Sequence, residues 1–267
     1  MKKIALLFAV ASLLLTTSCS DYNRVVKGDD YQSKFKLANE LYDRGQELRA
    51  VPLYEQVYQR MPKTSEGEVS FYRLGKAFYV EEDWVMAGYY LGSFAVKFPY
   101  SPKCEETQFL SALCAVQNSP EASLDQTDTE LALNDLQLFV QQYPNSSRID
   151  TCNKIMNRMR FKLQTKEVLN VRLYSRTENF RAAVVSAQAF LESYPISVYR
   201  EEVFMILVKN SYLLAINSID TKKRERRDLA LERIHNFLAE FPNSDYLREF
   251  ESYSDKLTEL PINDKAQ

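Results

Sequence analysis

Phe98-Pro99-Tyr100-Ser101 closes an aromatic-rich helical stretch, and the same kind of phrase occurs four more times along the chain. A large apolar residue before Pro ends a helix, because Pro has no amide hydrogen and disfavours α geometry in the residue before it. A Ser or Thr two residues after the Pro can cap the following helix. This repetition predicts stacked helix pairs, which are typical of binding scaffolds rather than of enzymes. The other copies are Met61-Pro62-Lys63-Thr64, Tyr143-Pro144-Asn145-Ser146, Tyr194-Pro195-Ile196-Ser197 and Phe241-Pro242-Asn243-Ser244.

The stretch that leads to Pro99 matches the marker positions of a tetratricopeptide repeat. Gly75 and Ala87 are small where the two helices of the pair cross, whereas Phe94 stands where the usual residue is small. An earlier stretch fits equally well, with Gly45 as the residue that ends its first helix, and a later stretch is recognisable. The three sets of markers are Phe71, Leu74, Gly75, Phe78, Ala87, Leu91, Phe94 and Pro99; Leu37, Ala38, Leu41, Gly45, Ala50, Tyr54, Val57 and Pro62; and Tyr174, Ala183, Phe190 and Pro195.

We therefore predict an all-α fold, an α-solenoid of about five tetratricopeptide-like helix pairs that ends in a capping helix over 246–260. The third pair is expected to carry a polar loop over 117–128 between its helices, and the fifth pair a loop over 217–227. The fourth pair begins with a long helical stretch from about Ile149, which we expect to be interrupted near 164–166. Only six Gly and nine Pro occur in the chain, which agrees with a helical fold.

The N-terminus has the pattern of a secretory signal peptide: the basic pair Lys2-Lys3, an apolar run over 4–15, and small residues before Cys19. A Cys at this position resembles the end of a bacterial lipobox, although Thr16 replaces the usual apolar residue. The pattern predicts that Cys19 becomes the first mature residue and carries acyl chains such as palmitate, which hold a protein at a membrane. Ser20 follows, rather than the Asp of an inner-membrane retention signal, so we expect sorting to the outer membrane.

The chain is expected to divide into five segments. They are a lipoprotein signal peptide over 1–18, a flexible lipidated tether over 19–29, an N-terminal half with repeats one to three over 30–147, a C-terminal half with repeats four and five and the cap over 148–260, and a loose tail over 261–267.

Charge and residue types exclude several functions. Without Lys2 and Lys3 the chain has 32 basic and 36 acidic residues, a net charge of −4, which argues against nucleic acid as a partner. We expect no cofactor, no metal and no catalytic residue, since the single His235 lies in a predicted helix and no nucleophile has an obvious base beside it. Cys104 and Cys114 lie about 15 Å apart on one predicted helix and cannot pair. Unpaired buried thiols are expected, with pairing of Cys152 to one of them as the alternative.

The first helices of repeats one and two present a mixed face on the side away from their partner helices. Aromatic rings there stand among amide and ammonium groups, which suits an extended or strand-like peptide that carries aromatic residues. The alternative is that several of these rings stack between adjacent repeats. The six candidate groove residues are Phe35, Asn39, Tyr42, Tyr72, Lys76 and Tyr79.

A basic run over 222–227 is the strongest local charge bias of the mature chain. It is interpreted as a docking loop for an acidic partner or an anionic lipid headgroup, with an ordinary solvated insertion as the alternative. Its cations are Lys222, Lys223, Arg224, Arg226 and Arg227.

The lipobox-like Cys19, the five repeats and the long helical stretch before the fourth repeat together resemble the BamD family, the lipoprotein component of the outer-membrane β-barrel assembly machinery. The resemblance covers the chain from Lys34 to about Leu257. It implies a non-enzymatic subunit on the periplasmic face of the outer membrane. It also implies that the C-terminal half, roughly 166–241, binds the periplasmic domains of the barrel-forming subunit BamA. The N-terminal half would receive the aromatic-ended terminal strand of unfolded outer-membrane proteins.

Other functions stay open on the sequence alone. A different periplasmic tetratricopeptide adaptor, for instance one that coordinates peptidoglycan enzymes or other envelope complexes, would have the same features. A glycan-binding lipoprotein of the outer surface is disfavoured, because those proteins are about twice as long and often carry an acidic export signal, whereas only Asp21 follows Cys19 closely. An enzyme is the least favoured alternative.

Overall fold

The computed structural model describes residues 22–261, in which all regular secondary structure is helical. Contacts divide the described chain into two compact units: the first holds 22–120 and 127–156, and the second holds 121–126 and 157–261. Within these residues, no helix is both long and apolar enough to cross a membrane. The signal peptide, Cys19 and the tail after Pro261 lie outside the described residues, so the expectations for them remain predictions.

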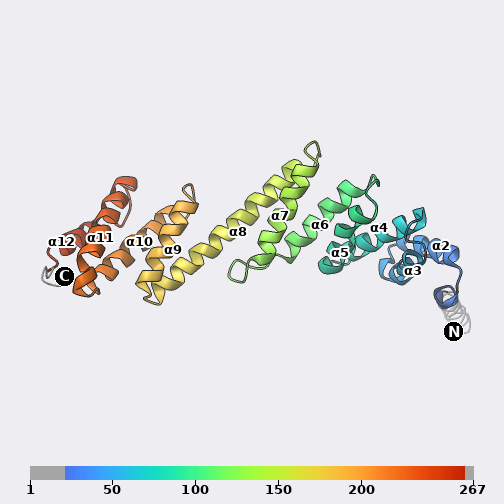
Figure 1. The fold of residues 1–267 in the computed structure, drawn as a ribbon, viewed down its shortest axis with the longest axis horizontal. Coiled ribbons are helices and arrows are strands. Elements are labelled where there is room, and N and C mark those ends of the chain that lie inside the picture. Colours follow the sequence, from blue (N-terminus) through green and yellow to red (C-terminus); the bar gives the residue numbers. More distant parts are fainter. Residues whose placement is uncertain (1–21, 262–267) are drawn as a thin grey trace, which may run out of the picture. The chain divides into compact units, whose positions relative to one another are not determined.

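Three helix pairs form the first unit, and each helix packs on the next one along the chain (Figure 1). The first helix of each pair is α2, α4 or α6, here called an A helix, and its partner is the B helix α3, α5 or α7. The opening eight residues of α8 also belong to this unit. The bounds are α2 Tyr31–Asp43, α3 Glu47–Arg60, α4 Ser65–Val80, α5 Trp84–Lys97, α6 Cys104–Asn118, α7 Thr127–Gln142 and α8 Ile149–Arg176.

The second unit contains the rest of α8 and four further helices, among which α10 packs on both α9 and α11. Helix α12 packs on α10 and α11 and buries Phe250 and Leu257 completely, while the ring of Tyr253 stacks on Tyr212 with centroids 4.0 Å apart. The predicted all-helical fold of tetratricopeptide-like pairs with a C-terminal cap is therefore confirmed. The bounds are α9 Phe180–Ser193, α10 Arg200–Ile216, α11 Asp220–Glu240 and α12 Leu247–Thr258.

Each of the five phrases with a large apolar residue before Pro ends a B helix in the same way, as predicted. The amide of Phe98 donates to the carbonyl of Phe94 at 2.8 Å, and the other four phrases repeat this last helical bond at 2.8–2.9 Å. At the four phrase residues whose torsions are described, φ then lies between −131° and −122° and ψ between 52° and 67°. A residue before Pro is driven out of α geometry by contact with the Pro ring, which explains the common ending.

Four of the five phrases also place a ring against the ring one turn earlier. The centroid distances are 5.0–5.2 Å and the interplanar angles 40–45°, a tilted packing that aromatic pairs favour. The earlier ring is fully or almost fully buried in every case, so each helix end is fixed to the core. The pairs are Phe94–Phe98, Phe139–Tyr143, Phe190–Tyr194 and Phe237–Phe241.

The hydroxyl residues of the phrases serve two different purposes. Thr64 caps α4 as predicted, because its Oγ1 accepts from the amide of Gly67 at 3.1 Å. Ser101 does not cap a helix, since α6 begins three residues later. Its Oγ instead accepts from the amide of Lys103 at 3.2 Å and donates to the carboxylate of Glu68 on α4 at 2.7 Å. The predicted capping role is thus wrong for this Ser, which joins two A helices instead.

Three of the turns between A and B helices, in pairs one, two and four, contain a left-handed residue. Gly45 has φ 70°, and Glu82 and Glu178 occupy the equivalent places in pairs two and four with φ 58° and 57°. The amide after each of them donates to the carbonyl five residues earlier, at 2.9–3.0 Å. The expectation that Gly45 ends the first helix is confirmed, and two non-glycine residues are held in the same conformation.

The crossing of α4 and α5 depends on Gly75. A Cβ atom there would lie 2.8 Å from the side chain of Leu91, which is too close for any real contact. Ala87 and Leu91 on α5 are buried against this point. The small residue expected at the helix crossing is therefore required by packing.

Two expected irregularities are absent from the described helices. Only 217–219 separate α10 from α11, so the basic run over 222–227 is helical and the predicted loop is wrong. The run consists of Lys, Arg and Glu, all good helix formers. Helix α8 continues without interruption through 164–166, where the Thr165 hydroxyl donates to the carbonyl of Phe161 at 2.9 Å. By contrast, the predicted loop of the third pair is present over 119–126.

The segment before α2 differs from the expected flexible tether. Residues 22–27 are helical, and the Tyr22 hydroxyl donates to the carbonyl of Arg49 at 2.9 Å. Val25 and Val26 pack against the first core cluster, which includes Leu41. Apolar side chains at these positions thus bind the segment to the first helix pair from Tyr22 onward.

We expect Glu82→Gly to stabilise the first unit by up to about 1 kcal/mol, because a left-handed conformation is unfavourable for a residue with a Cβ and not for Gly. Glu81→Gly serves as the control: Glu81 has φ −79° and ψ 4°, so its replacement should lower stability instead. The free energy of unfolding from urea titrations checks both variants. Equal effects at the two positions would contradict this explanation.

Candidate functional site

The six residues predicted to line a peptide groove lie on α2 and α4, and all six are partly buried. Their described contacts place them in three groups. Two meet a carboxylate on α6, two meet a guanidinium on α4, and two belong to the packing of the helix pairs.

Glu106 on α6 joins Tyr72 and Lys76. The Tyr72 hydroxyl donates to both carboxylate oxygens at 3.0 Å, and the Lys76 ammonium lies 3.1 Å from one of them. The Tyr72 ring also lies 5.0 Å from the Lys103 ammonium and packs edge-on against Phe94. An accessible ring is thereby held between two cations and a carboxylate.

Electrostatics fix the protonation of this group. Burial raises the pKa of the Glu106 carboxyl, but the hydrogen bonds from Lys76 and Tyr72 outweigh it and hold that pKa below its ordinary value of 4.5. Burial and the hydrogen bond to Glu106 raise the pKa of Tyr72. At neutral pH, a charged carboxylate therefore accepts from a neutral phenol and an ammonium, and links α4 to α6.

Arg73 forms the second group, between α4 and the first pair. Its Nη1 donates to Asn39 Oδ1 and to the Tyr54 hydroxyl, both at 3.1 Å. The same nitrogen lies 3.1 Å from the Asp43 carboxylate, and the guanidinium lies 4.6 Å from the centroid of the Tyr42 ring. Asn39 and Tyr42 are therefore brought together by a cation that faces the predicted groove.

Phe35 and Tyr79 form the third group and take part in packing. Phe35 lies against the first core cluster, and Tyr79 meets Trp84 edge-on at 5.3 Å and 78°. Part of the predicted aromatic face thus contributes to packing, and the contact of Tyr79 with Trp84 lies within one helix pair, whereas the alternative given above was stacking between adjacent repeats.

Arg73 and Glu106 were missed by reasoning from the sequence. The pairs that they form, Asn39 with Arg73 and Tyr72 with Glu106, are each separated by 34 residues, the period of the tetratricopeptide repeat. An alignment of the repeats at that period places the two partners of each pair at equivalent positions of neighbouring A helices. Opposite or complementary groups at such positions would have indicated both contacts.

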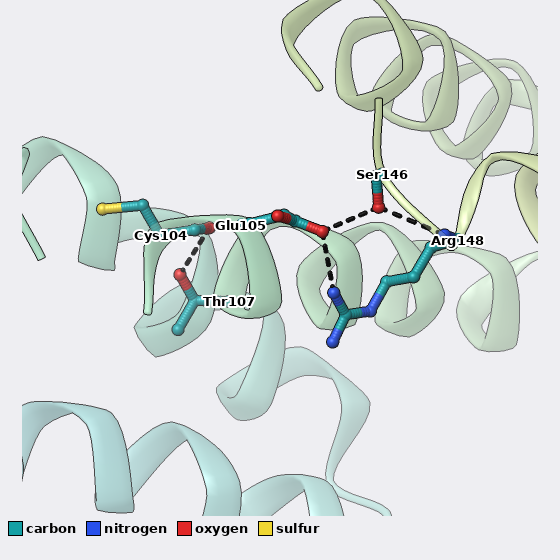
Figure 2. A network of polar contacts seen from close by, with 5 residues as sticks. All are labelled: Cys104, Glu105, Thr107, Ser146 and Arg148. Atoms are coloured by element: carbon teal, nitrogen blue, oxygen red, sulfur yellow. Dashed lines mark hydrogen bonds and ion pairs between the residues drawn. The ribbon is translucent and has the colours of Figure 1, made fainter. Parts of the chain in front are cut away.

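A second polar network joins α6 to the start of α8 (Figure 2). Glu105 accepts from the Ser146 hydroxyl at 2.7 Å and from the Arg148 guanidinium at 2.8 Å. Ser146 in turn accepts from the amide of Arg148 at 3.1 Å. The Glu105 carboxylate therefore connects α6 to the residues just before α8 and has a structural role. Glu68 has the same role one repeat earlier.

The five cations of the basic run lie in the first two turns of α11. Lys223 lies 3.4 Å from Asp220, Arg226 donates to the Ser218 hydroxyl at 2.7 Å, and Arg227 lies 2.8 Å from Asp228. Three of the five thus contact groups near their own helix start. Whether the run binds a partner stays a prediction.

The second unit has a cleft of about 710 Å³ between α9, α10 and α11. Leu191, Phe204 and Leu207 supply apolar surface to it. Arg200 crosses it and donates to both carboxylate oxygens of Glu240, at 2.5 and 3.0 Å. A fixed ion pair beside apolar side chains suits a protein partner better than a small polar ligand.

Cys104, Cys114 and Cys152 are free thiols. Burial raises the pKa of Cys114 to about 12, so this thiol stays protonated and unreactive. Among residues 22–261, no group of His, Cys, Asp and Glu side chains is arranged to hold a metal ion. His235 is exposed on α11.

Comparison with known proteins gives matches of different strength. The model of the family YfiO, described as outer membrane lipoprotein, matches residues 29–229. Outer membrane protein assembly factor BamD of Caulobacter vibrioides is 25% identical over 175 residues, which are 66% of this chain and 57% of that protein. A thermophilic tetratricopeptide-repeat protein of Thermus thermophilus has 15% identity and a TM-score of 0.32 over 86% of this chain and all of that one. A score this low supports no conclusion.

We expect Glu106→Gln to lower the free energy of unfolding by about 0.5–1 kcal/mol near pH 7, a modest effect because water screens a pair that is partly exposed. A carboxyl group whose pKa is lower in the folded state stabilises the folded protein at any pH above its ordinary pKa. This contribution to the free energy of unfolding is lost as the pH falls through the pKa of the folded state. The difference from the unchanged protein should therefore shrink at an acidic pH well below the ordinary carboxyl pKa of 4.5. Urea titrations at both pH values test this, with Glu81→Gln at the exposed end of α4 as control. A loss that is the same at both pH values would rule out a role of the charge.

Proposed function

The chain belongs to the YfiO family of outer membrane lipoproteins, and from this membership we propose that it is a non-enzymatic subunit of the machinery that assembles β-barrel proteins in the outer membrane. The family match over 29–229 carries the proposal, because it extends from just before α2 into the middle of α11. The Caulobacter relative, named an outer membrane protein assembly factor, supports the same direction. The match spans only 57% of that relative's length, so partners and substrates are part of the proposal.

The proposed location is the periplasmic face of the outer membrane, with acylated Cys19 as the anchor. The signal-like segment over 1–18 and the small residues before Cys19 support export and lipidation. Several acyl chains on one residue hold a protein at a membrane far more firmly than one chain does. Ser20 after the Cys supports the outer membrane as the destination.

The proposed substrates are unfolded outer-membrane proteins that present an extended segment with aromatic residues. The face of α2 and α4 offers two partly exposed tyrosines, Tyr42 and Tyr72. Tyr42 lies beside the hydrogen-bonded guanidinium of Arg73. Tyr72 lies beside the Lys103 ammonium and shares a carboxylate with Lys76. Rings of an extended peptide can pack on these tyrosines, while Arg73 and Lys76 complement a terminal carboxylate. This arrangement supports recognition of strand-like segments in the first unit.

We expect the double variant Tyr42→Ala and Tyr72→Ala to bind an aromatic-ended peptide at least about tenfold more weakly, since each aromatic contact is worth roughly 1 kcal/mol. Fluorescence anisotropy with a labelled peptide measures the affinity. The matched control is Tyr89→Ala with Tyr100→Ala, which removes two exposed rings from α5 and from the turn after it. Undiminished binding by the first variant, or an equal loss in the control, would move the peptide site elsewhere.

The proposed partner of the second unit is a barrel-forming subunit of the BamA type, which would dock through its periplasmic domains. The cleft between α9, α10 and α11 supports this assignment, because it combines apolar side chains with the Arg200–Glu240 pair. Leu229 lies on its α11 side and is 39% exposed. The basic run over 222–227 lies on the same helix and is proposed as part of the docking surface.

Purification of the lipoprotein from detergent extracts, through a tag after Gln267, tests the function directly. We expect a large β-barrel protein with periplasmic repeats to co-purify, and Leu229→Glu to reduce its recovery at least severalfold by placing a charge in an apolar contact. Leu138→Glu, at an exposed leucine of α7, is the matched control and should leave recovery unchanged. Recovery of peptidoglycan enzymes without a barrel protein would contradict the proposed function. Unchanged recovery of the barrel protein with the Leu229→Glu variant would contradict only the proposed docking at the cleft.

A further inference from the structure

A cleft at the N-terminal edge of the first unit has no part in the peptide groove described above. It has a volume of about 400 Å³ and lies between the helix over 22–27, α2 and the start of α3. Tyr22 and Val25 supply ring and apolar surface, and Lys36, Arg44 and Arg49 supply three cations. Among the described residues that line it, the only carboxylate is Glu40, so the cleft is positively charged.

The three cations can bind an anion, because they do not form close ion pairs in the described contacts of the cleft. Arg44 is 68% exposed and its contact with Glu40 is long, at 3.8 Å. Arg49 lies over the Tyr22 ring, 4.8 Å from its centroid, and donates to the amide oxygen of Gln46. Lys36 is exposed. Leu48, 58% exposed at the start of α3, adds an apolar side chain next to Arg49.

The short chain between Cys19 and Tyr22 limits the distance between this cleft and a lipid on Cys19. Only Ser20 and Asp21 separate Tyr22 from Cys19, and three residue steps of a fully extended chain span at most about 11 Å. Tyr22 itself is fixed to the first helix pair by its hydrogen bond to Arg49 and by the packing of Val25. If Cys19 is acylated, the cleft is held close to the lipid headgroups.

We propose that this cleft seats the phosphate of an anionic lipid headgroup in the leaflet that holds the anchor, and that the edge of the first helix pair rests on the membrane surface. The inference depends on the lipidation of Cys19 in the proposed function and adds a specific contact to it. Cations on long side chains suit the task, because their stems lie along apolar surface while their charges reach the phosphates. Electrostatic attraction is screened over about 8 Å at physiological ionic strength, a distance comparable to the span of at most about 11 Å that the connection allows.

Fluorescence quenching in vesicles tests the contact on the full lipidated chain. The reporter is Leu48→Trp in a Trp84→Phe background, reconstituted into phosphatidylcholine vesicles with and without phosphatidylglycerol, together with a lipid that carries a spin-label quencher on its headgroup. Tyr100→Trp in the same background is the reference, because Tyr100 is fully exposed in the turn after the far end of α5. We expect at least twofold quenching at position 48 in phosphatidylglycerol vesicles and little at position 100.

Charge reversal then separates recognition from mere proximity. Lys36→Glu with Arg44→Glu should lower the quenching at position 48 at least twofold, and only in vesicles that contain phosphatidylglycerol. Arg60→Glu with Lys63→Glu is the matched control, at exposed sites at the other end of α3, roughly 20 Å away. Equal quenching with and without phosphatidylglycerol, or no effect of the first reversal, overturns the inference.

Mass spectrometry of the mature N-terminal peptide distinguishes the two levels of failure. If Cys19 is acylated but the fluorescence at position 48 is not quenched more with phosphatidylglycerol than without it, only the headgroup contact is refuted. An N-terminal peptide without acyl chains would refute the proposed anchor and the inference together. Unchanged circular dichroism of each charge variant confirms that the exposed substitutions leave the helices folded.

Discussion

The helix ends at the five phrases with a large apolar residue before Pro are the constraint on which the rest of the structure depends. At each phrase, the residue before Pro makes the last helical hydrogen bond and then leaves α geometry. In four phrases a tilted pair of rings fixes that residue to the core. The next A helix therefore starts at a defined point and direction. The hydroxyl that follows connects two A helices at Ser101, which bonds Glu68, and at Ser146, which bonds Glu105, whereas Thr64 caps α4.

Local patterns were sufficient to predict the helix pairs, but not the contacts between them. The phrases, Gly45 and Gly75 indicated where helices end and cross, because those positions obey strict backbone or steric rules. The expected loop over 217–227 is wrong for the basic run over 222–227, because Lys, Arg and Glu also favour helix. Helix α8 passes through 164–166 without a break, and the Thr165 hydroxyl there donates to the carbonyl of Phe161 on the same helix.

The candidate site could be predicted only in part, for a related reason. The sequence of each A helix indicates which side chains lie on its surface. It does not indicate the contacts of Arg73 and Glu106, which bind residues one repeat away. Tyr72 and Lys76 therefore do more than line a surface: they also connect α4 to α6 through one carboxylate. A peptide that packs on Tyr72 would contact the same group that sets the distance between neighbouring repeats. Binding at this face and the spacing of the repeats are thus expected to influence each other.

Within the units, the packing of helices on their neighbours along the chain has a further consequence, for folding kinetics. Chains whose contacts are local in sequence lose little entropy in closing loops, so they fold fast and can begin at any repeat. The three thiols are free, so no slow pairing of cysteines among the described helices delays the process. A chain of this kind can acquire its structure repeat by repeat, before its C-terminal residues have folded.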